Sequence, residues 1–464
     1  MDGVISQNAR FMEVKAVMTE RYSNLVVPLP HEGTDMRTKE TADNCRAASC
    51  AVTPPNNRRS DVESTIGTPT PGIRTSTTVT RTTTTRTTSC AALPYADQNA
   101  QTEFSFPELV QAYFDCRRTK RNSASALEFE INLEHNLRDL YDQLIDGSYA
   151  PGRSICFVIT RPKPREVWAA DFRDRIVHHL LHNRVAPRFH NSFIADSCAC
   201  IPGRGTLYAA QRLDSKVRSI TQNWTRPTYY LKCDVANFFV SIDKRILRDL
   251  LAERITEPWW MKLSETILFH DPRQNFELRG DITQIDLVPI HKRLGSHPAY
   301  LGLPIGNHSS QFFANVYMNV QDQFAKHGIR CRHYIRYVDD FIMLHESAQW
   351  LNEAKAQIED LLARKLRIRL NPKKTILQRV DRGIDFVGQV IKPWHRSIRR
   401  RTFNDALQRV SQIDSSNLFE TANSYFGLLG QSPSSHHDRA LLANIVRDRG
   451  FSVNRALTKT FRRK

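Results

Sequence analysis

The sequence predicts an α+β fold, and three observations support this prediction. Residues 229–233 read as a strand that ends at Asp234. The stretch "YIRYVDDFIML" (334–344) places apolar, β-branched runs on both sides of Asp339 and Asp340, which favours a strand, a turn and a second strand. Segments with helical spacing of apolar residues occur before, between and after these strands.

Three helical segments illustrate that spacing. Residues 104–116 repeat apolar side chains at Phe106, Leu109, Val110 and Tyr113. Asp243 can cap a second helix, whose apolar face comprises Ile246, Leu247, Leu250, Leu251 and Ile255. A glycine-containing loop precedes the third, within residues 302–324, and its apolar stripe comprises Phe313, Val316, Val320 and Phe324.

Composition limits the classes of protein and partner. A chain of 464 residues with 40% hydrophobic side chains can bury a substantial core and is long enough for more than one domain. Its formal net charge of +18 favours polyanionic partners, either nucleic acid or an anionic membrane surface. No run approaches the roughly 18 apolar residues of a membrane span, and no signal peptide is recognisable. Nine scattered cysteines favour a reduced, cytoplasmic compartment, and the pair Cys198 and Cys200 lacks the partners of a zinc site.

The first hundred residues differ from the rest of the chain. Residues 53–89 form a Thr/Arg/Pro-rich run that lacks the large apolar side chains needed to offset the entropy of ordering. We therefore predict that residues 1–100 are a disordered, basic, low-complexity tail. Such a tail could hold nucleic acid non-specifically, be dispensable, or precede the true start codon.

The three acids indicate a chemistry. An acid at the end of a strand, beside an acid pair on a hairpin, is the arrangement with which a polymerase palm holds two divalent cations. Mg²⁺ requires oxygen ligands, and bound cations would relieve the repulsion between Asp339 and Asp340. The sequence therefore predicts a site for two Mg²⁺ ions at Asp234, Asp339 and Asp340, whereas an isolated acid pair would read as a solvated turn.

Basic residues recur in two further segments. Lys163 and Arg165 lie in a proline-stiffened stretch and suit an incoming triphosphate, although a solvated basic strand gives the same pattern. Arg204 lies in a glycine-flanked turn (201–205) that leads into a helix and could contact backbone phosphate. The histidines of "RIVHHLLHN", at 178, 179 and 182, lack a third ligand nearby and are interpreted as packing residues.

In the order and spacing of these blocks, residues 105–430 resemble reverse transcriptases. Asp234 is similar to the acid of the first palm motif, and Tyr337-Val338-Asp339-Asp340 is similar to the YxDD box. Phe239, five residues after Asp234, resembles the aromatic gate that excludes a ribose 2′-hydroxyl. Residues 366–378 read as a strand ending in a Pro-Lys-Lys turn, in which Lys374 resembles the lysine of the fourth palm motif. "FVG" (386–388) resembles the primer grip.

This resemblance implies a right-hand architecture and a set of roles. The fingers would span residues 101–226, the palm 227–394 with a polar insertion at about 271–300, and a short helical thumb 395–464. Asp234, Asp339 and the backbone carbonyl of Val235 would bind Mg²⁺, with Asp340 supporting the geometry and Lys374 protonating pyrophosphate. The residues expected at the incoming dNTP are Lys163, Arg165, Phe239, Ile305 and Gly306. Those expected at the RNA template and the DNA or RNA primer are Arg204, Tyr337, Phe386 and Gly388.

Within that superfamily the sequence is most similar to the enzymes of diversity-generating retroelements. The palm loop reads "IGNHSSQ", the polar insertion resembles one found in those enzymes, and "NSYFGLL" (423–429) resembles their thumb. The resemblance implies error-prone copying of a repeat RNA with mutations at adenines. It also implies a basic oligomeric accessory protein and a bacterial or phage-infected cytoplasm, with no membrane partner.

Two alternatives remain. The chain could be another bacterial reverse transcriptase, of the group II intron, retron or phage-defence type. About 70 residues follow the primer-grip segment, too few for a thumb plus a maturase or endonuclease domain, which disfavours the intron type. It could also be a non-catalytic RNA-binding scaffold, but such a scaffold has no need for acids at all three positions.

Overall fold

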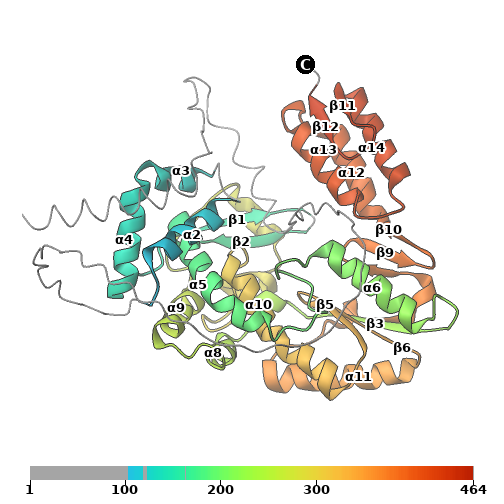
Figure 1. Ribbon diagram of the computed structural model, residues 1–464, viewed down its shortest axis with the longest axis horizontal. Coiled ribbons are helices and arrows are strands. Elements are labelled where there is room, and N and C mark those ends of the chain that lie inside the picture. Colours follow the sequence, from blue (N-terminus) through green and yellow to red (C-terminus); the bar gives the residue numbers. More distant parts are fainter. Residues whose placement is uncertain (1–102, 119–122, 162, 463–464) are drawn as a thin grey trace, which may run out of the picture. The chain divides into compact units, whose positions relative to one another are not determined.

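The computed structural model describes residues 103–118, 123–161 and 163–462 (Figure 1). The tail predicted to be disordered, residues 1–100, lies outside these ranges. The α-helices are α2 (Phe106–Arg117), α3 (Ala124–Ile131), α4 (Leu133–Asp146), α5 (Phe172–His190), α6 (Thr206–Ile220), α7 (Phe238–Ser241), α8 (Lys244–Ala252), α9 (Pro258–Phe269), α10 (His308–Gln323), α11 (Ala348–Leu361), α12 (Arg400–Gln412), α13 (Ser415–Leu429) and α14 (His436–Asp448).

The strands are β1 (Ser154–Ile159), β2 (Arg165–Ala169), β3 (Tyr229–Asp234), β4 (Phe276–Leu278), β5 (His333–Tyr337), β6 (Asp340–His345), β7 (Ile376–Arg379), β8 (Ile384–Phe386), β9 (Gln389–Lys392), β10 (His395–Ile398), β11 (Phe451–Val453) and β12 (Thr460–Arg462). The predicted strand at 229–233 and the predicted strand–turn–strand at 334–344 are both confirmed, as β3 and as the β5–β6 hairpin. The Asp243 cap of α8 is also confirmed, since its carboxylate accepts a hydrogen bond from the backbone N–H of Arg245.

The central sheet has the antiparallel order β5-β6-β3-β7. Alternate residues of its strands enter two different cores. Leu231, Phe341 and Met343 join a large cluster with α10 and α11, whereas Tyr230 and Ile342 join a second cluster with α6. Figure 1 shows α6 on one side of these strands and α11 on the other. Burial on both faces explains why the interior of β6, Phe341–Leu344, reads as a continuous apolar run in the sequence.

The polar insertion contributes to a second sheet. Its strand β4 pairs in parallel with β1, which in turn pairs antiparallel with β2. The insertion is also fixed to β2 by Glu166, whose Oε2 accepts a hydrogen bond from the backbone N–H of Leu294 at 2.8 Å. The insertion predicted within the palm therefore shares a sheet with strands of the predicted fingers, so this sheet crosses the predicted boundary at residue 226.

One strand prediction was wrong. Residues 366–370 do not form a strand before the Pro-Lys-Lys turn, because Leu362–Leu366 is a π-helical turn that ends α11 and Arg367 is left-handed (φ 52°). Only Leu370 makes an isolated bridge, to Val235. The strand in this segment, β7, follows the turn instead of preceding it. The turn itself, Pro372–Lys374, is present as a single 3₁₀ turn.

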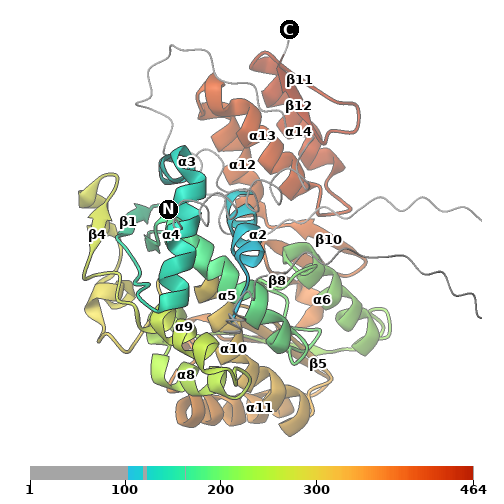
Figure 2. The same ribbon diagram turned by 60° about the vertical axis from the view of Figure 1, so that its left-hand side comes forward.

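The C-terminal residues form their own core. Helices α12, α13 and α14 pack against one another around Val410, Phe426 and Leu442 (Figures 1 and 2). Strand β10, the first element of the predicted thumb, pairs with β9 and so continues the small β8–β9–β10 sheet. None of the described helices is both long enough and apolar enough to cross a membrane.

Candidate active site

The three predicted acids meet at one end of the central sheet. Asp234 is the last residue of β3 and lies directly opposite Asp340, the first residue of β6. Asp339 occupies the two-residue turn before β6, and its carbonyl accepts a 3.3 Å hydrogen bond from the N–H of Val235. The strand register therefore brings together residues that are a hundred positions apart in the chain.

The electrostatics of this site reflect its crowded carboxylates. Burial, reinforced by the neighbouring charges of Asp234 and Asp340, raises the pKa of Asp339 to about 7. Burial also raises the pKa of Asp340, with Lys232 opposing the shift and Asp234 reinforcing it. The Nζ of Lys374 lies 2.6 Å from Asp234 Oδ2. The site therefore concentrates more negative charge than its adjacent cations neutralise.

The donor set fits hard divalent cations, although it is not a closed cage. In the described part of the chain, no group of three or more His, Cys, Asp or Glu side chains is arranged so that it could hold a metal ion as the side chains lie. Instead, the ammonium group of Lys374 contacts an oxygen of Asp234. Three clustered carboxylates that offer only oxygen donors are nonetheless suited to Mg²⁺. A site for two Mg²⁺ ions remains a prediction, and the chemistry of these residues is compatible with it.

Two of the residues predicted to bind the incoming dNTP, Ile305 and Gly306, lie in a loop that is attached to β2. The loop at 302–307 is fixed to β2 by two hydrogen bonds: Trp168 N–H donates to the carbonyl of Ile305 at 2.7 Å, and Ala170 N–H donates to Asn307 Oδ1 at 2.8 Å. Ile305 is half-buried, whereas Lys163 and Arg165 are exposed at the start of β2. The loop therefore places Ile305 and Gly306 beside the strand that begins with Arg165.

Gly306 is the residue that permits this close approach. Its φ of +133° is rare for other residues, and a Cβ there would lie 2.7 Å from the carbonyl oxygen of Trp168. The same loop reaches the predicted gate, because Leu303 N–H donates to the carbonyl of Phe239 at 2.8 Å. Phe239 is half-buried in α7. The loop that carries Ile305 and Gly306 is thus hydrogen-bonded to the predicted gate, a connection that the sequence did not reveal.

The predicted template and primer residues differ in accessibility. The Nη1 atom of Arg204 donates hydrogen bonds to the carbonyls of Ile194 and Ser197, both at 2.7 Å. This part of the guanidinium therefore stabilises the local loop. Tyr337 is half-buried against the second core cluster. Gly388 lies in the turn between β8 and β9.

Phe386 requires a correction. Its side chain is fully buried in the core formed with α6 and the central sheet. Apolar burial of this extent leaves no ring surface for a template or primer, so its position in the motif reflects packing. Any contact with nucleic acid from this segment has to come from the half-buried turn that follows, at Val387 and Gly388.

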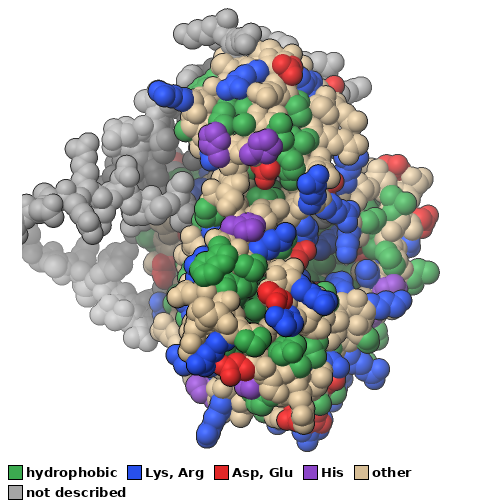
Figure 3. Space-filling view, turned by 90° about the vertical axis from the view of Figure 1, so that its right-hand side faces the viewer, with side chains coloured by type: hydrophobic (Ala, Val, Ile, Leu, Met, Phe, Trp, Pro, Cys, Tyr) green, Lys and Arg blue, Asp and Glu red, His purple; other side chains and the backbone are tan. Residues whose placement is uncertain are grey.

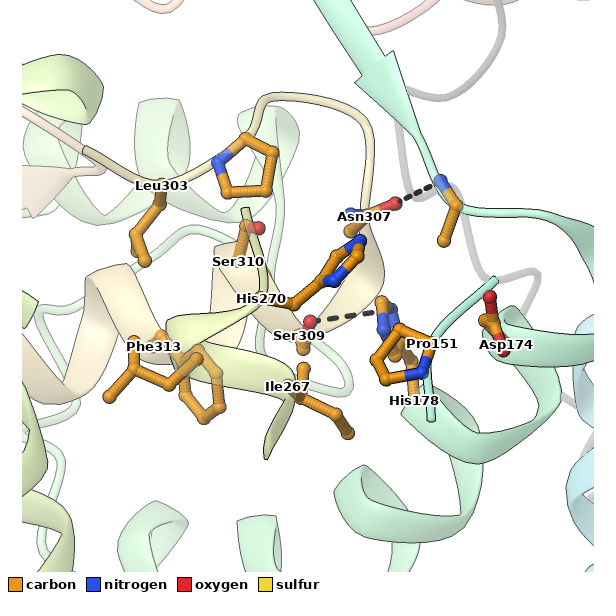
Figure 4. A pocket seen from close by; sticks show the side chains of 13 residues that line it. Pro151, Asp174, His178, Ile267, His270, Leu303, Asn307, Ser309, Ser310 and Phe313 are labelled. Atoms are coloured by element: carbon orange, nitrogen blue, oxygen red, sulfur yellow. Dashed lines mark hydrogen bonds between the residues drawn. The ribbon is translucent and has the colours of Figure 1, made fainter. Parts of the chain in front are cut away.

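The histidines of α5 pack in the interior, as the sequence predicted. Burial lowers the pKa of His178 and His179 to about 3 each, and His178 lies 3.4 Å from Ser309 Oγ (Figure 4). The pocket in Figure 4 lies beside the loop at 302–307, with Asp174, His270 and Leu303 also in its lining. None of the three clustered acids lines it.

Charged side chains are distributed unevenly on the surface. On the face shown in Figure 3, Lys and Arg side chains gather around its hollowed centre, whereas Asp and Glu are scattered. This distribution agrees with the net charge of +18 and suits a phosphate backbone.

The chain was compared with curated proteins and with solved structures. No curated protein matches the chain. One similar solved structure is telomerase from Candida albicans in complex with a fragment of telomeric RNA, at 12% identity and a TM-score of 0.38, covering 64% of this chain and 54% of that one. Another is apo telomerase from Candida tropicalis truncated from its C-terminal domain, at 13% identity and a TM-score of 0.38, covering 55% and 58%. The chain thus spans a little over half the length of these structures.

Residues 161–391 match the family model described as reverse transcriptase (RNA-dependent DNA polymerase). This range contains all three clustered acids, the loop at 302–307 and the central sheet. The α+β, right-hand polymerase fold predicted from the sequence is confirmed. Residues 161–391 of the chain therefore form a reverse transcriptase domain.

Proposed function

We propose that this protein copies an RNA template into DNA at the site formed by Asp234, Asp339 and Asp340. The observation that supports this most directly is the pairing of Asp234 with Asp340 across β3 and β6, with Asp339 in the adjoining turn of a reverse transcriptase domain. Asp234, Asp339 and the carbonyl of Val235 would hold two Mg²⁺ ions, and Asp340 would support their geometry. When bound, the ions supply Lewis-acid stabilisation of the attacking 3′-hydroxyl and of the departing pyrophosphate.

The surrounding residues bind and orient the substrates. Lys163 and Arg165 are exposed, so their side chains are accessible to the triphosphate of a dNTP. Phe239 would exclude a 2′-hydroxyl. Lys374 would move from Asp234 to donate a proton to the departing pyrophosphate, which is within the capacity of an exposed lysine.

More specifically, we propose the error-prone enzyme of a diversity-generating retroelement. The support is the "IGNHSSQ" loop and the likeness of the polar insertion and of residues 423–429 to those enzymes. Ile305 presents an apolar side chain where most relatives carry a glutamine amide, and its carbonyl is held by Trp168. A basic accessory protein, a DNA or RNA primer and a bacterial or phage-infected cytoplasm complete this proposal.

Primer extension on a defined RNA template, followed by sequencing of the cDNA, tests both levels of the proposal. We expect Mg²⁺-dependent DNA synthesis with errors concentrated opposite template adenines. Ile305→Gln should lower total misincorporation several-fold, because one added hydrogen bond contributes about 1 kcal/mol, or roughly tenfold at most. The matched control is Ile305→Leu, which keeps an apolar side chain and the backbone hydrogen bond.

The outcomes separate the two levels. Absence of RNA-templated synthesis would refute the polymerase proposal. Faithful synthesis, or an error spectrum that is equal at all four bases, would refute the retroelement assignment and favour another bacterial reverse transcriptase. An Ile305→Gln spectrum identical to that of Ile305→Leu would show that infidelity arises from other residues.

A further inference from the structure

A fully buried ion pair lies behind the acid-bearing turn. Arg336, in β5, and Asp322, near the end of α10, have side chains that are each 0% exposed. The guanidinium contacts the carboxylate through two hydrogen bonds, Nε to Oδ1 at 2.8 Å and Nη2 to Oδ2 at 2.7 Å. The carboxylate also accepts a hydrogen bond from the hydroxyl of Tyr334 at 2.7 Å. Such a two-point contact fixes the plane of the arginine head group as well as its position.

The remaining donors of Arg336 are also used. Nη2 donates to Ser197 Oγ at 2.8 Å, and Nη1 donates to Asn315 Oδ1 at 3.2 Å. The last N–H of Nη1 donates to the backbone carbonyl of Val338 at 2.8 Å. A guanidinium has five N–H donors, so every one of them has a partner. The fixed head group therefore holds the backbone of the turn that carries Asp339.

That turn adopts a conformation that its own sequence disfavours. Val338 has φ of +57°, in the left-handed region. For a β-branched side chain this conformation is a genuine outlier and costs on the order of 1–3 kcal/mol, so it persists only where the surroundings impose it. The hydrogen bond from Arg336 to the Val338 carbonyl is a contact that imposes it.

We propose that Arg336, held by Asp322, is a positioning residue that keeps Val338 left-handed and thereby directs Asp339 and Asp340 toward Asp234. This inference rests on the proposed function, because the benefit of the geometry is divalent-cation binding by the three acids. Stability alone does not require the arrangement, since apolar residues of similar volume can replace a buried ion pair without loss of stability. A lysine at 336 would keep the charge but could not reproduce the five-donor fork.

The first test compares Arg336→Lys with the parent protein in two assays. Mn²⁺ binding, followed by electron paramagnetic resonance of the free ion, should weaken about tenfold, as is typical when a residue that orients metal ligands is changed. In primer extension, kcat should fall about tenfold or more while the KM for dNTP changes by less than about threefold. Asp322→Asn should act in the same direction, because it removes the carboxylate that fixes the guanidinium.

The matched control is Arg188→Lys. Arg188 in α5 makes a similar two-point contact, with Glu257 at 2.6 and 2.5 Å, but among the described residues it makes no hydrogen bond to the hairpin. The Arg188→Lys variant should keep a Mn²⁺ affinity within about twofold of that of the parent. Thermal melting of each variant and binding of an RNA–DNA duplex without divalent cation monitor folding and the basic surface separately.

A double-mutant cycle tests the link to Val338. Glycine adopts the left-handed region freely, so Val338→Gly reduces the need for an imposed conformation. We expect Arg336→Lys to weaken Mn²⁺ binding at least about threefold less in the Val338→Gly background than in the parent. If Arg336→Lys alone does not fold, Asn315→Ala and Ser197→Ala each remove one contact to the guanidinium and should weaken Mn²⁺ binding to a lesser degree.

Three results would overturn the inference: an unchanged Mn²⁺ affinity in folded Arg336→Lys, an effect equal to that of Arg188→Lys, or strictly additive effects in the cycle. Failure of the proposed function looks different. In that case the parent protein makes no DNA, yet Mn²⁺ binding by the three acids and its dependence on Arg336 can still be measured. Loss of Mn²⁺ binding in Asp339→Asn confirms that the signal comes from this site.

Discussion

Two tight turns of the chain invite comparison, because each joins adjacent antiparallel strands with two residues and each begins with a left-handed valine. In the β5–β6 turn, Val338 has φ of 57° and is followed by Asp339. In the β8–β9 turn, Val387 has φ of 45° and is followed by Gly388, with φ of 84°. Only the second turn has a glycine at a position that needs positive φ, and that pattern is typical of a type I′ hairpin turn.

The supports of the two turns differ accordingly. The Gly388 carbonyl accepts one backbone hydrogen bond, from Arg399 N–H at 3.0 Å, near exposed side chains. The Val338 carbonyl is held by a fully buried guanidinium that makes five hydrogen bonds to four residues. The first turn is thus shaped by tertiary contacts around an unfavourable sequence, whereas the second relies largely on its own glycine. The strained turn carries the acids, as expected where function requires a defined geometry.

The largest expected difference between the turns is catalytic. Asp339→Asn removes one negative charge from the acid cluster that we propose binds Mg²⁺, and should reduce DNA synthesis at least about a hundredfold. Asp385→Asn, the matched change beside the other turn, should keep activity within about threefold of the parent. Both are measured by primer extension with Mg²⁺, together with RNA binding, which should be unchanged. Activity within tenfold of the parent in Asp339→Asn would contradict the assignment of the site.

The next difference concerns stability in a chelating buffer. The pKa of Asp339 is raised from 3.8 to about 7, so the folded state binds this proton more tightly than the unfolded state. The stabilisation that comes from binding this proton in the folded state is therefore present at low pH and lost as pH rises from about 4 to 7. At pH 8, Asp339→Asn should be more stable than the parent by on the order of 2 kcal/mol, and the gain should shrink toward pH 5.

Denaturant titrations at several pH values with EDTA measure this effect. Asp385→Asn serves as the control and should be slightly destabilised at pH 8, because it loses its ion pair with Arg399. If the difference in stability between the parent and Asp339→Asn does not vary with pH, ionisation of Asp339 does not destabilise the folded protein.

A smaller effect tests the glycine of the second turn. Gly388→Ala should destabilise the protein by about 1 kcal/mol, because alanine pays a steric penalty at φ of 84°. No atom lies within 4 Å of the added Cβ, so crowding does not contribute. Gly295→Ala is the matched control, with equal space and no positive φ, and should change the free energy of unfolding by less than about 0.5 kcal/mol. Equal effects at both sites would mean that Gly388 does not set the turn.

The smallest effect is expected at the exposed pair beside the second turn. Arg399→Gln breaks the ion pair with Asp385. Because the side chains of Arg399 and Asp385 are 39% and 48% exposed, the free energy of unfolding should fall by at most about 0.5 kcal/mol. Salt should screen this contribution. A loss as large as that in Arg336→Lys would erase the contrast between the two turns.

Much of the site was predictable from local sequence, because acids that end apolar strands stand out by contrast. The strand before Asp234, the hairpin around Asp339 and Asp340, and the helix capped by Asp243 all follow from periodicity and capping. Phe386 was misassigned because an apolar residue beside a turn looks the same in sequence whether its ring is exposed or packed. The strand expected before the Pro-Lys-Lys turn failed because α11 continues as a π-helical turn through Leu366.

Arg336 and Asp322 carried no signal in the sequence. They are 14 residues apart, in a strand and a helix, and an arginine within "YIRYVDD" reads as one more basic residue of a basic protein. Nor did any pattern show that the loop at 302–307 is bonded to β2 and to Phe239. Such contacts depend on which distant segments pack together.

The sequence by itself determined the elements and the identity of the acids, since strand alternation, helix capping and the placement of charge are local properties. The tertiary structure decided how those acids are presented. It set the register that places Asp234 opposite Asp340, the burial that raises the pKa of Asp339, and the guanidinium that holds Val338 left-handed. Register, burial and buried hydrogen bonds arise only when separate segments exclude water together, so no local pattern encodes them.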